Sequence, residues 1–267
     1  MTLKEITNEL DSYGAENPRD EALIIIEHVT GLSPAKIMLD MQKSYTDPAI
    51  FEILEKRREH FPLQYILGKW EFMGKEFFVS PDCLIPRPDT EILVGKAIEL
   101  TKDGADVCDL CTGSGCIGIS IALSKRVNLT LLDISSGALN MARKNAQAHN
   151  VNADFVLGDL RYDIPNKQFD IITVNPPYIP KEVIKTLSEE VKKEPSLALD
   201  GGEDGLDLIR HLLEKTVCSL KVGGKMLIEF GYDQEAPIVE LLCSYGLTSY
   251  EILYDYGKNP RVLIIYK

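Results

Sequence analysis

Hydrophobic and polar positions follow two different periods along the chain, and the period changes near residue 69. Over residues 1–66, apolar side chains recur three or four positions apart, which is the spacing of short amphipathic helices. Residues 69–79 instead alternate with a period of two on either side of Gly74, which is the pattern of a β-hairpin. The chain is therefore expected to begin with a small helical domain, followed by a hairpin that links it to the rest.

Local signals mark where helices begin in the first region. Thr2 and Glu5 have the spacing of a capping box. Arg57 and Arg58, in the last helical stretch, are interpreted as part of a solvated face rather than as a binding site. Three further pairs place a helix-capping residue directly before a proline at the first helical position: Asn17-Pro18, Ser33-Pro34 and Asp47-Pro48.

From residue 106 onward, short apolar runs alternate with stretches of helical spacing. This alternation predicts a mostly parallel sheet with helices on both faces. The link over residues 255–260 is too short for a crossover helix, so the last strand should run antiparallel to its neighbour. The predicted helices are residues 90–100, 115–125, 136–149, 181–193, 205–221 and 233–245. The predicted strands are Val107–Leu110, Leu129–Asp133, Asp154–Leu157, Phe169–Val174, Lys225–Phe230, Leu247–Tyr254 and Arg261–Tyr266.

Charge and composition narrow the classes of function. The 267 residues carry a formal net charge of −12, which argues against non-specific binding to nucleic acid through its phosphates. No run of 18 apolar residues occurs and the N-terminus lacks a signal-peptide core, so we expect a soluble, cytoplasmic protein with no membrane segment. Cys108, Cys111 and Cys116 have spacing that a metal site could use, but no histidine is near, so we interpret them as reduced, buried residues and expect no metal.

A glycine-rich turn follows the first strand of the sheet. Residues 109–118 read as the end of a strand, a turn containing Gly113 and Gly115, and the start of a helix. Such glycines let the backbone approach a ligand, and the helix N-terminus supplies free N–H groups. The turn lacks the Lys-Ser/Thr pair of a P-loop. By itself it does not exclude a dinucleotide-binding site.

Acidic residues follow the next two strands. Asp133 ends the second strand, where a carboxylate can accept both hydroxyl groups of a ribose. Asp159 comes after the third strand, where it could accept the exocyclic amine of adenine. Each aspartate alone fits a helix cap or a solvated strand end. Together, beside the glycine turn, they predict an adenosine pocket at one edge of the sheet.

The stretch Asn175-Pro176-Pro177-Tyr178 follows the fourth strand. Prolines cannot donate to a strand ladder, so these residues should form a stiff loop at the edge of the sheet where ligands bind. The loop offers an amide and an aromatic ring but neither a general base nor a nucleophile. It could hold a planar group that carries an NH₂, or it could be a strand that simply ends at prolines.

These residues, in this order, resemble the seven-strand S-adenosylmethionine-dependent methyltransferases that modify planar nitrogens. Three further stretches, residues 85–91, 194–205 and 257–261, resemble the HemK/PrmC family, and the resemblance covers essentially the whole chain. It implies a Rossmann-like α/β sheet whose last strand is antiparallel. It also implies three parts: a helical substrate-docking domain over residues 1–68, a hairpin linker over 69–84, and a methyltransferase domain over 85–267.

The resemblance also implies roles for individual residues. The Asn175 side-chain oxygen and the Pro176 carbonyl would each accept an N–H of a glutamine amide, while Tyr178 would pack on that amide. Cys111 stands where the family more often has glycine. Cofactor contacts would come from Asp109, Cys111, Thr112, Gly113, Ser114, Gly115, Asp133, Ile134, Asp159, Leu160 and Asn175. Substrate contacts would come from Asn175, Pro176, Pro177, Tyr178, Arg87 and Glu194.

Two of these positions have simpler interpretations. Arg87 could contact substrate or could pair with Asp89 or Glu91 in a salt bridge. Glu194 lies in a stretch, continuing through Gly201 and Gly202, that could order a lid or could form a tight turn before the next helix. The sequence leaves these alternatives open.

The family methylates the side-chain nitrogen (N5) of the glutamine in the Gly-Gly-Gln motif of class-1 peptide-chain release factors. The resemblance therefore implies this protein substrate and S-adenosylmethionine as cofactor. The acidic balance argues against direct contact with nucleic acid, and we expect a monomer, although the sequence itself does not give the oligomeric state. Three alternatives remain: an N-methyltransferase acting on adenine N6 or guanine N2, a non-catalytic binding module, and a dinucleotide oxidoreductase.

Overall fold

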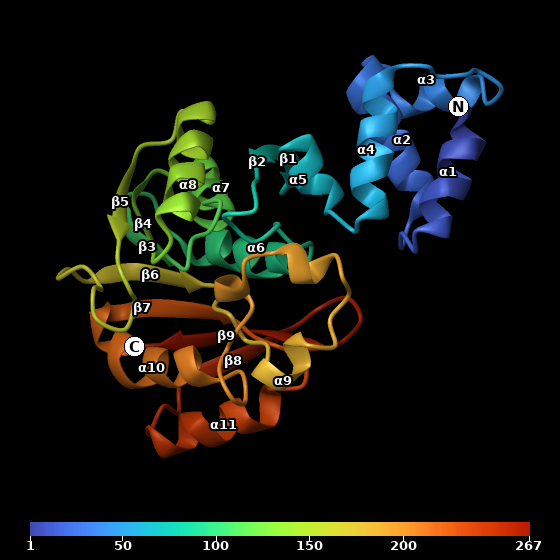
Figure 1. Ribbon diagram of the computed structural model, residues 1–267. Helices are drawn as coiled ribbons and strands as arrows, with labels where there is room; N and C mark the ends of the chain where they lie inside the picture. Colours follow the sequence, from blue (N-terminus) through green and yellow to red (C-terminus); the bar gives the residue numbers. More distant parts are fainter. The chain divides into compact units, whose positions relative to one another are not determined.

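The computed structural model describes residues 1–267 and divides into two units (Figure 1). The first unit comprises Met1–Gly68 together with Ser188–Lys193, and the second comprises Lys69–Leu187 together with Glu194–Lys267. Because residues 188–193 lie within the second unit in sequence but pack with the first, the chain passes between the units more than once. The two units are described separately.

Five helices form the first unit, and their apolar faces enclose one core. Leu3, Ile6 and Leu10 bury the inner face of the first helix, as their spacing predicts. Ile25 and Ile26 of the second helix are fully buried in the same core. The helices are α1 (Leu3–Ser12), α2 (Pro18–Thr30), α3 (Pro34–Leu39), α4 (Pro48–Arg58) and α5 (Leu63–Leu67).

The predicted helix starts are confirmed, but only some of the predicted caps form. Thr2 and Glu5 make the full capping box at α1, and the Asp47 side chain accepts the amide of Ala49 at 3.0 Å. Asn17 and Ser33 make no side-chain cap bond, so the capping prediction is wrong for both. Proline at the first helical position is the feature that α2, α3 and α4 share, because its fixed φ already suits a helix.

The interpretation of Arg57 as a solvated residue is wrong. Its side chain is only 4% exposed, and its Nε and one Nη bind both carboxylate oxygens of Glu21 at 2.9 and 3.0 Å. It also donates to the carbonyl of Phe61 at 2.8 Å and to Glu190 at 3.0 Å. The buried guanidinium thus fastens residues 188–193 to the first unit. Arg58 is half exposed, as expected.

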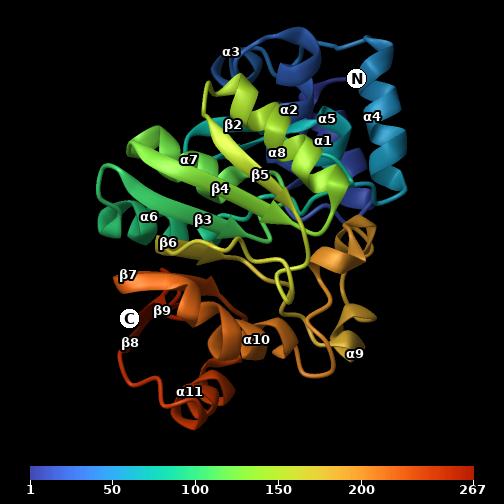
Figure 2. The same cartoon turned by 90° about the vertical axis from the view of Figure 1, so that its left-hand side faces the viewer.

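The second unit starts with the predicted hairpin and continues into a seven-strand sheet. The hairpin strands are β1 (Lys69–Phe72) and β2 (Lys75–Phe78), joined by Met73 and Gly74, both with positive φ. The sheet order is β5-β4-β3-β6-β7-β9-β8, parallel up to β7 and antiparallel at β9 (Figure 2). The sheet strands are β3 (Ala105–Leu110), β4 (Val127–Asp133), β5 (Ala153–Leu157), β6 (Phe169–Val174), β7 (Leu220–Glu229), β8 (Tyr250–Tyr254) and β9 (Pro260–Tyr266).

Helices cover the two faces of this sheet in two separate groups (Figures 1 and 2). Neighbouring residues on one strand face opposite cores: Ile171 joins the core under α6, α7 and α8, whereas Ile172 joins the core under α10 and α11. This alternation is the period of two that a strand imposes on its side chains. The helices are α6 (Thr90–Leu100), α7 (Cys116–Ser124), α8 (Ser136–Ala148), α10 (Asp207–Lys215) and α11 (Glu235–Ser244).

The helix predicted over residues 181–193 is wrong. Only α9 (Lys181–Ile184) and a single 3₁₀ turn at Val191–Lys193 form there. None of the α9 residues is buried, so the stretch lacks the apolar contacts on which helices mostly depend. Its later part, Ser188–Lys193, instead packs with the first unit. The helix predicted over 205–221 is shorter as well, because a 3₁₀ turn at Thr216–Ser219 follows α10.

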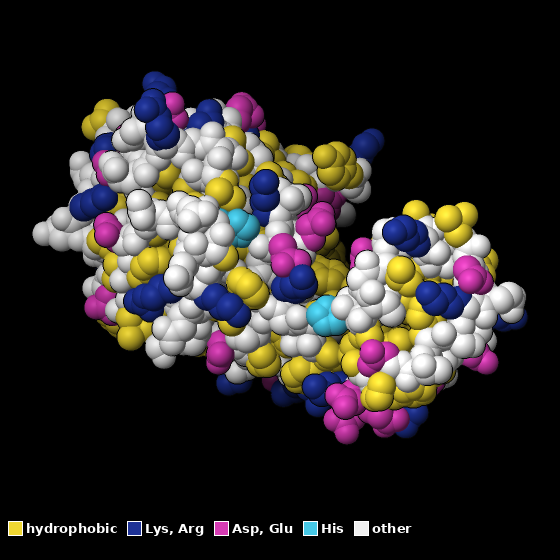
Figure 3. Space-filling model, turned by 90° about the horizontal axis from the view of Figure 1, so that it is seen from above, with side chains coloured by type: hydrophobic (Ala, Val, Ile, Leu, Met, Phe, Trp, Pro, Cys, Tyr) yellow, Lys and Arg dark blue, Asp and Glu magenta, His cyan; other side chains and the backbone are white.

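The surface mixes charges of both signs. On the face shown in Figure 3, Lys and Arg side chains are interspersed with Asp and Glu, and no broad field of basic side chains is present. None of the helices is both long and apolar enough to cross a membrane. This face therefore offers no continuous basic track for a phosphate backbone.

Candidate active site at the carboxyl edge of the sheet

A cavity of about 340 Å³ lies at the carboxyl ends of four neighbouring strands. Loops after β3, β4, β5 and β6 all contribute to its walls, as expected for an open α/β sheet. A volume of this order suits a small-molecule ligand. The predicted residues that line it are Arg87, Cys111, Thr112, Gly113, Ser114, Asp133, Ile134, Asp159, Leu160, Asn175 and Pro177.

Asp109 lies under the glycine turn rather than in the cavity wall. Its carboxylate is fully buried and accepts hydrogen bonds from the hydroxyls of Thr112 at 2.5 Å and Thr173 at 2.8 Å, and from the amide of Gly118 at 3.2 Å. Burial raises its pKa to about 6. Asp109 therefore ties the turn to the strand that leads into Asn175.

The glycine turn has the backbone conformations that its sequence suggests. Gly113 and Gly115 have φ values of 56° and 80°, in the left-handed region that favours glycine. Cys111 also has a positive φ, of 53°, which gives a physical reason for glycine to be the commoner residue there. A Cβ added at Gly113 would meet no protein atom within 4 Å, so the backbone is open on that side.

Asp133 connects the ends of two strands. Its carboxylate accepts the amide of Gly113 at 2.8 Å and that of Ser135 at 2.9 Å, and it lines the cavity. Burial raises its pKa, and these backbone hydrogen bonds lower it in part. A carboxylate held in this way presents fixed acceptors, which suits recognition of vicinal hydroxyl groups.

Asp159 follows β5 and lines the same cavity. Both of its carboxylate oxygens bind the guanidinium of Arg161, at distances of 2.6 to 3.0 Å. This pairing lowers the pKa of Asp159, so the group is an anionic acceptor at neutral pH. An amine donor at this position would share the carboxylate with Arg161.

The Asn175 loop extends from the end of β6, and its parts face different ways. Asn175 and Pro177 line the cavity, whereas Pro176 is buried and Tyr178, which is half-buried, is not among the lining residues. The side-chain nitrogen of Asn175 donates to the hydroxyl of Thr90 at 3.3 Å. The other arm of this planar amide is an oxygen that can accept a hydrogen bond from a ligand.

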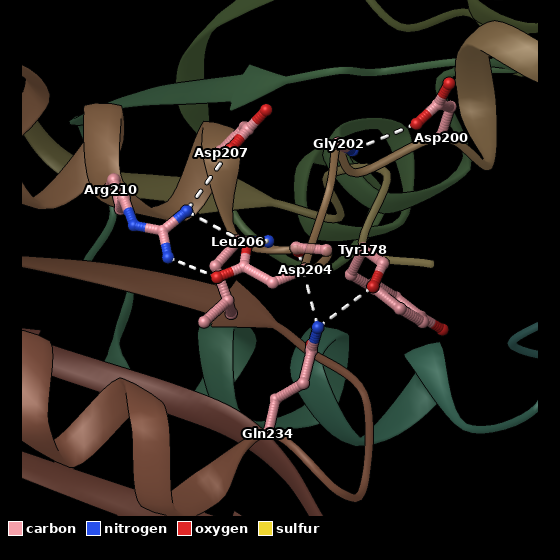
Figure 4. A network of polar contacts seen from close by, with 9 residues as sticks. Tyr178, Asp200, Gly202, Asp204, Leu206, Asp207, Arg210 and Gln234 are labelled. Atoms are coloured by element: carbon pink, nitrogen blue, oxygen red, sulfur yellow. Dashed lines mark hydrogen bonds and ion pairs between the residues drawn. The ribbon is translucent and has the colours of Figure 1, made fainter. Parts of the chain in front are cut away.

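Tyr178 is fixed from two sides. Its hydroxyl donates to Glu229 at 3.4 Å. Its carbonyl accepts from Nε2 of Gln234 at 2.9 Å (Figure 4). The same Nε2 reaches the carbonyl of Gly205 at 3.3 Å, and Oε1 of Gln234 accepts the amide of Gly231 at 2.8 Å. Gln234 thus uses both arms of its amide to join the loop to two neighbouring segments.

Two glycines allow these segments to approach Tyr178. A Cβ at Gly201 would lie 2.7 Å from the Tyr178 Cα, and one at Gly205 would lie 2.2 Å from the Tyr178 carbonyl oxygen. The segment is paired with the loop by hydrogen bonds from Ile179 to Leu199 and from Gly201 to Ile179, both of 3.0 Å. Residues 199–205 therefore pack as a backing for the Asn175 loop.

Arg87 and Glu194 contact each other. One Nη of Arg87 pairs with Glu194, whose second oxygen accepts the amide of Ile85 at 3.2 Å. Glu194 is 5% exposed, and only Arg87 of the two lines the cavity. Arg87 therefore does form a salt bridge, but with Glu194 and not with Asp89 or Glu91. Asp89 pairs with Arg261 at 3.0 Å, and Glu91 accepts the amide of Met73 at 2.7 Å.

Three residues at the site were not predicted from the sequence: Thr90, Glu229 and Gln234. Thr90 lies in residues 85–91, a stretch that the sequence singles out only for the family resemblance and for Arg87. Glu229 gave a signal, since a carboxylate within the apolar run at the end of a central strand needs a partner. Gln234 carried none that we can identify, because its partners are backbone carbonyls distant in sequence.

Two protein-family models match the chain. The methyltransferase small domain model matches residues 89–203, and the PrmC N-terminal domain model matches residues 2–68. Together they span the helical region and much of the cavity wall.

Three proteins of similar sequence share the description release factor glutamine methyltransferase. A release factor glutamine methyltransferase of Moorella thermoacetica is 34% identical and covers 100% of this chain and 99% of its own length. One from Geobacter sulfurreducens is also 34% identical, over 95% of this chain and 91% of its own. Another, from Clostridium acetobutylicum, is 40% identical over 80% of this chain and 78% of its own.

Solved structures resemble the second unit in fold. The 16S rRNA methyltransferase RsmC of T. thermophilus, solved with AdoMet and guanosine, matches with a TM-score of 0.53 at 18% identity, over 74% of this chain and 49% of its own. A methyltransferase from Pyrococcus furiosus matches with a TM-score of 0.53 at 19% identity, over 73% of this chain and 90% of its own. At these identities the likeness concerns the fold alone, and it confirms the fold class predicted from the sequence.

Proposed function

The chain belongs to the release factor glutamine methyltransferase family, and from that premise we propose that it methylates a glutamine side chain of a class-1 peptide-chain release factor. The resemblance to the HemK/PrmC family noted in the sequence is confirmed by this membership. The acceptor atom is the amide nitrogen, N5, of the glutamine in the Gly-Gly-Gln motif. The cofactor is S-adenosylmethionine.

The lining of the cavity supports this choice of cofactor. Asp133 offers acceptors for the ribose hydroxyls, and Asp159 offers one for the adenine amine. The turn at Gly113 exposes backbone where the amino acid part of the cofactor would approach. When bound, S-adenosylmethionine supplies a methyl group that its sulfonium makes electrophilic.

The observation that carries the proposal is the orientation of Asn175. Its nitrogen donates to Thr90, so its oxygen remains to accept an N–H of the substrate amide. The Pro176 carbonyl would accept the second N–H. With both protons held, the substrate nitrogen is fixed in direction, and positive charge that develops on it during attack meets two acceptors.

Positioning and fixed dipoles would therefore provide most of the rate acceleration. A glutamine nitrogen is a weak nucleophile because its lone pair is delocalised into the carbonyl. Tyr178, fixed by Glu229 and Gln234, would pack on the flat amide. Pro177 would close the wall beside it.

The remaining parts of the proposal concern the whole chain. Residues 1–68 dock the release factor, and residues 85–267 catalyse the methyl transfer. Residues 69–84 form the hairpin that links these two parts. Arg87 and Glu194 act at the substrate side through the ion pair that ties residues 85–87 to residue 194. The protein acts in the cytoplasm as a monomer.

A comparison of three candidate methyl acceptors tests this function. Purified release factor, ribosomal RNA and DNA are each incubated with the protein and S-adenosylmethionine carrying a labelled methyl. We expect label in the release factor, and loss of that label with Asn175→Ala. Label in RNA or DNA instead would replace the proposed substrate by a nucleobase.

A further inference from the structure

We propose that Thr90 and Glu229 are positioning residues that hold the Asn175 side chain with its nitrogen turned inward and its oxygen available to the substrate. The inference rests on the proposed function, because it concerns the geometry of the same transfer. It adds two residues, from α6 and β7, that touch neither cofactor nor reacting atoms in the proposed mechanism and act through Asn175.

The three side chains form a connected set in which Asn175 and Thr90 line the cavity and Glu229 lies outside its lining. Thr90 is the first residue of α6, is 2% exposed, and accepts the Asn175 side-chain nitrogen at 3.3 Å. Glu229 is the last residue of β7, is also 2% exposed, and lies close enough to the Thr90 hydroxyl for that hydroxyl to lower its pKa. The buried hydroxyl of Thr90 therefore connects the side-chain amide of Asn175 to the buried carboxylate of Glu229.

The chemistry of these groups fixes the direction of the hydrogen bonds. An ionised carboxylate can only accept, so in any hydrogen bond between Thr90 and ionised Glu229 the proton comes from the Thr90 hydroxyl. The Thr90 oxygen is then left as an acceptor, and only the NH₂ arm of Asn175 can face it. Without the carboxylate, Thr90 could donate to the Asn175 oxygen, which would turn the NH₂ toward the substrate.

Glu229 also orients Tyr178. The Tyr178 hydroxyl donates to one oxygen of Glu229 at 3.4 Å, while the other oxygen is buried without a partner. Burial raises the pKa of Tyr178, so its hydroxyl keeps its proton and remains a donor. The Glu229 carboxylate thus acts on both polar side chains of the Asn175 loop. It binds Tyr178 directly, and it acts on Asn175 through Thr90.

The ionisation of Glu229 connects this arrangement to pH. Burial, with a smaller contribution from Asp89, raises the pKa of Glu229 to about 7, although Thr90, Arg261 and Tyr178 act to lower it. The buried thiol of Cys116, at the start of α7, lies near enough for the Glu229 carboxylate to raise its pKa. Below this pKa the neutral carboxyl can donate to Thr90, which reverses the hydrogen bonds and exposes the wrong arm of Asn175.

The experiment compares two isosteric variants with a matched control. Thr90→Val and Glu229→Gln are assayed with release factor for kcat, KM and the pH dependence of kcat, and for the Kd of S-adenosylmethionine. Thr216→Val is the control, because Thr216 is also a buried threonine of the second unit and its hydroxyl has no partner.

We expect Thr90→Val to lower kcat about 10-fold to 100-fold with the Kd of the cofactor unchanged, and Thr90→Ser to restore most of the loss. The kcat of the wild-type protein should fall below about pH 7, and Glu229→Gln should abolish that fall. Thr216→Val should keep the wild-type kcat. Wild-type kcat in Thr90→Val, or an unchanged acidic limb in Glu229→Gln, would overturn the inference.

A second readout does not need activity. The side-chain amide protons of Asn175, assigned by their loss in Asn175→Ala, are followed by NMR. We expect them to shift toward the values of a free amide in Thr90→Val but not in Thr216→Val. Unchanged shifts in Thr90→Val would overturn the inference even if the wild-type protein methylated no release factor, whereas that failure alone would overturn only the proposed function.

Discussion

The carbonyl oxygen of Tyr178 accepts a hydrogen bond of 2.9 Å from the buried amide of Gln234, a residue 56 positions later in the chain. Through this contact the Asn175 loop is held by the segment that follows β7, and not only by the strand from which it emerges (Figure 4). The stiffness of the loop therefore depends on tertiary contacts as much as on its two prolines.

Gln234→Ala should weaken both stability and catalysis. The change leaves the carbonyls of Tyr178 and Gly205 and the amide of Gly231 without their partner, and a buried polar group left unpaired costs about 1–3 kcal/mol. We expect a lower midpoint of thermal unfolding and a lower kcat. The control is Gln147→Ala on the exposed side of α8, and equal effects of the two changes would contradict this role.

Gly205→Ala should displace the Asn175 loop. A Cβ there would lie 2.2 Å from the Tyr178 carbonyl oxygen, and φ is 79°. Gly246→Ala is a matched control, because its φ is 69° and no atom lies within 4 Å of the added Cβ. Both changes carry a backbone strain of about 1–2 kcal/mol. Urea unfolding should show a larger loss for Gly205→Ala, and losses of the same size would show that the close approach does not matter.

Asp133→Asn should reduce the affinity for S-adenosylmethionine about 10-fold or more, because it removes the charge from the acceptor of the ribose hydroxyls. Calorimetric titration measures the Kd directly. Asp154→Asn, an exposed change on the neighbouring strand β5, should bind the cofactor like the wild-type protein. If Asp133→Asn bound the cofactor normally, the adenosine pocket would have to be placed elsewhere.

The free energy of unfolding should fall as pH rises from about 5 to about 8. Burial raises the pKa of Glu229 to about 7 and that of Asp109 to about 6, so in this window the unfolded chain binds fewer protons than the folded one. For Glu229 the effect is at most about 3 kcal/mol. Asp106, whose pKa Lys221 lowers to about 2, titrates below this window.

Glu229→Gln checks that assignment through denaturant unfolding at two pH values. At pH 8 it should be more stable than the wild-type protein, since it no longer buries a charge, and at pH 5 the difference should shrink. A variant that is equally or less stable at pH 8 would show that Glu229 is not the source of the pH dependence.

Much of the site could be predicted because its residues follow strands in order. Asp133, Asp159 and Asn175 each come directly after an apolar run, and parallel strands bring their carboxyl ends to one edge. The position of these residues in the sequence therefore fixes where they meet in space. Local periodicity was sufficient for this part of the prediction.

The supporting contacts could not be predicted in the same way. Thr90, Glu229 and Gln234 reach the loop from α6, β7 and the turn before α11, and such contacts depend on how elements pack rather than on local pattern. The failed helix over residues 181–193 has a similar cause. Its sequence has helical spacing, but the contacts of Glu190 with Arg57 decide where that stretch lies.

The most direct test of the account is to locate the transferred methyl group. Release factor incubated with the protein and S-adenosylmethionine is digested and sequenced by tandem mass spectrometry. We predict one added methyl on the side-chain nitrogen of the glutamine in Gly-Gly-Gln, absent with Asn175→Ala although that variant still binds the cofactor. A methyl group on any other residue, or full methylation by Asn175→Ala, would contradict the account.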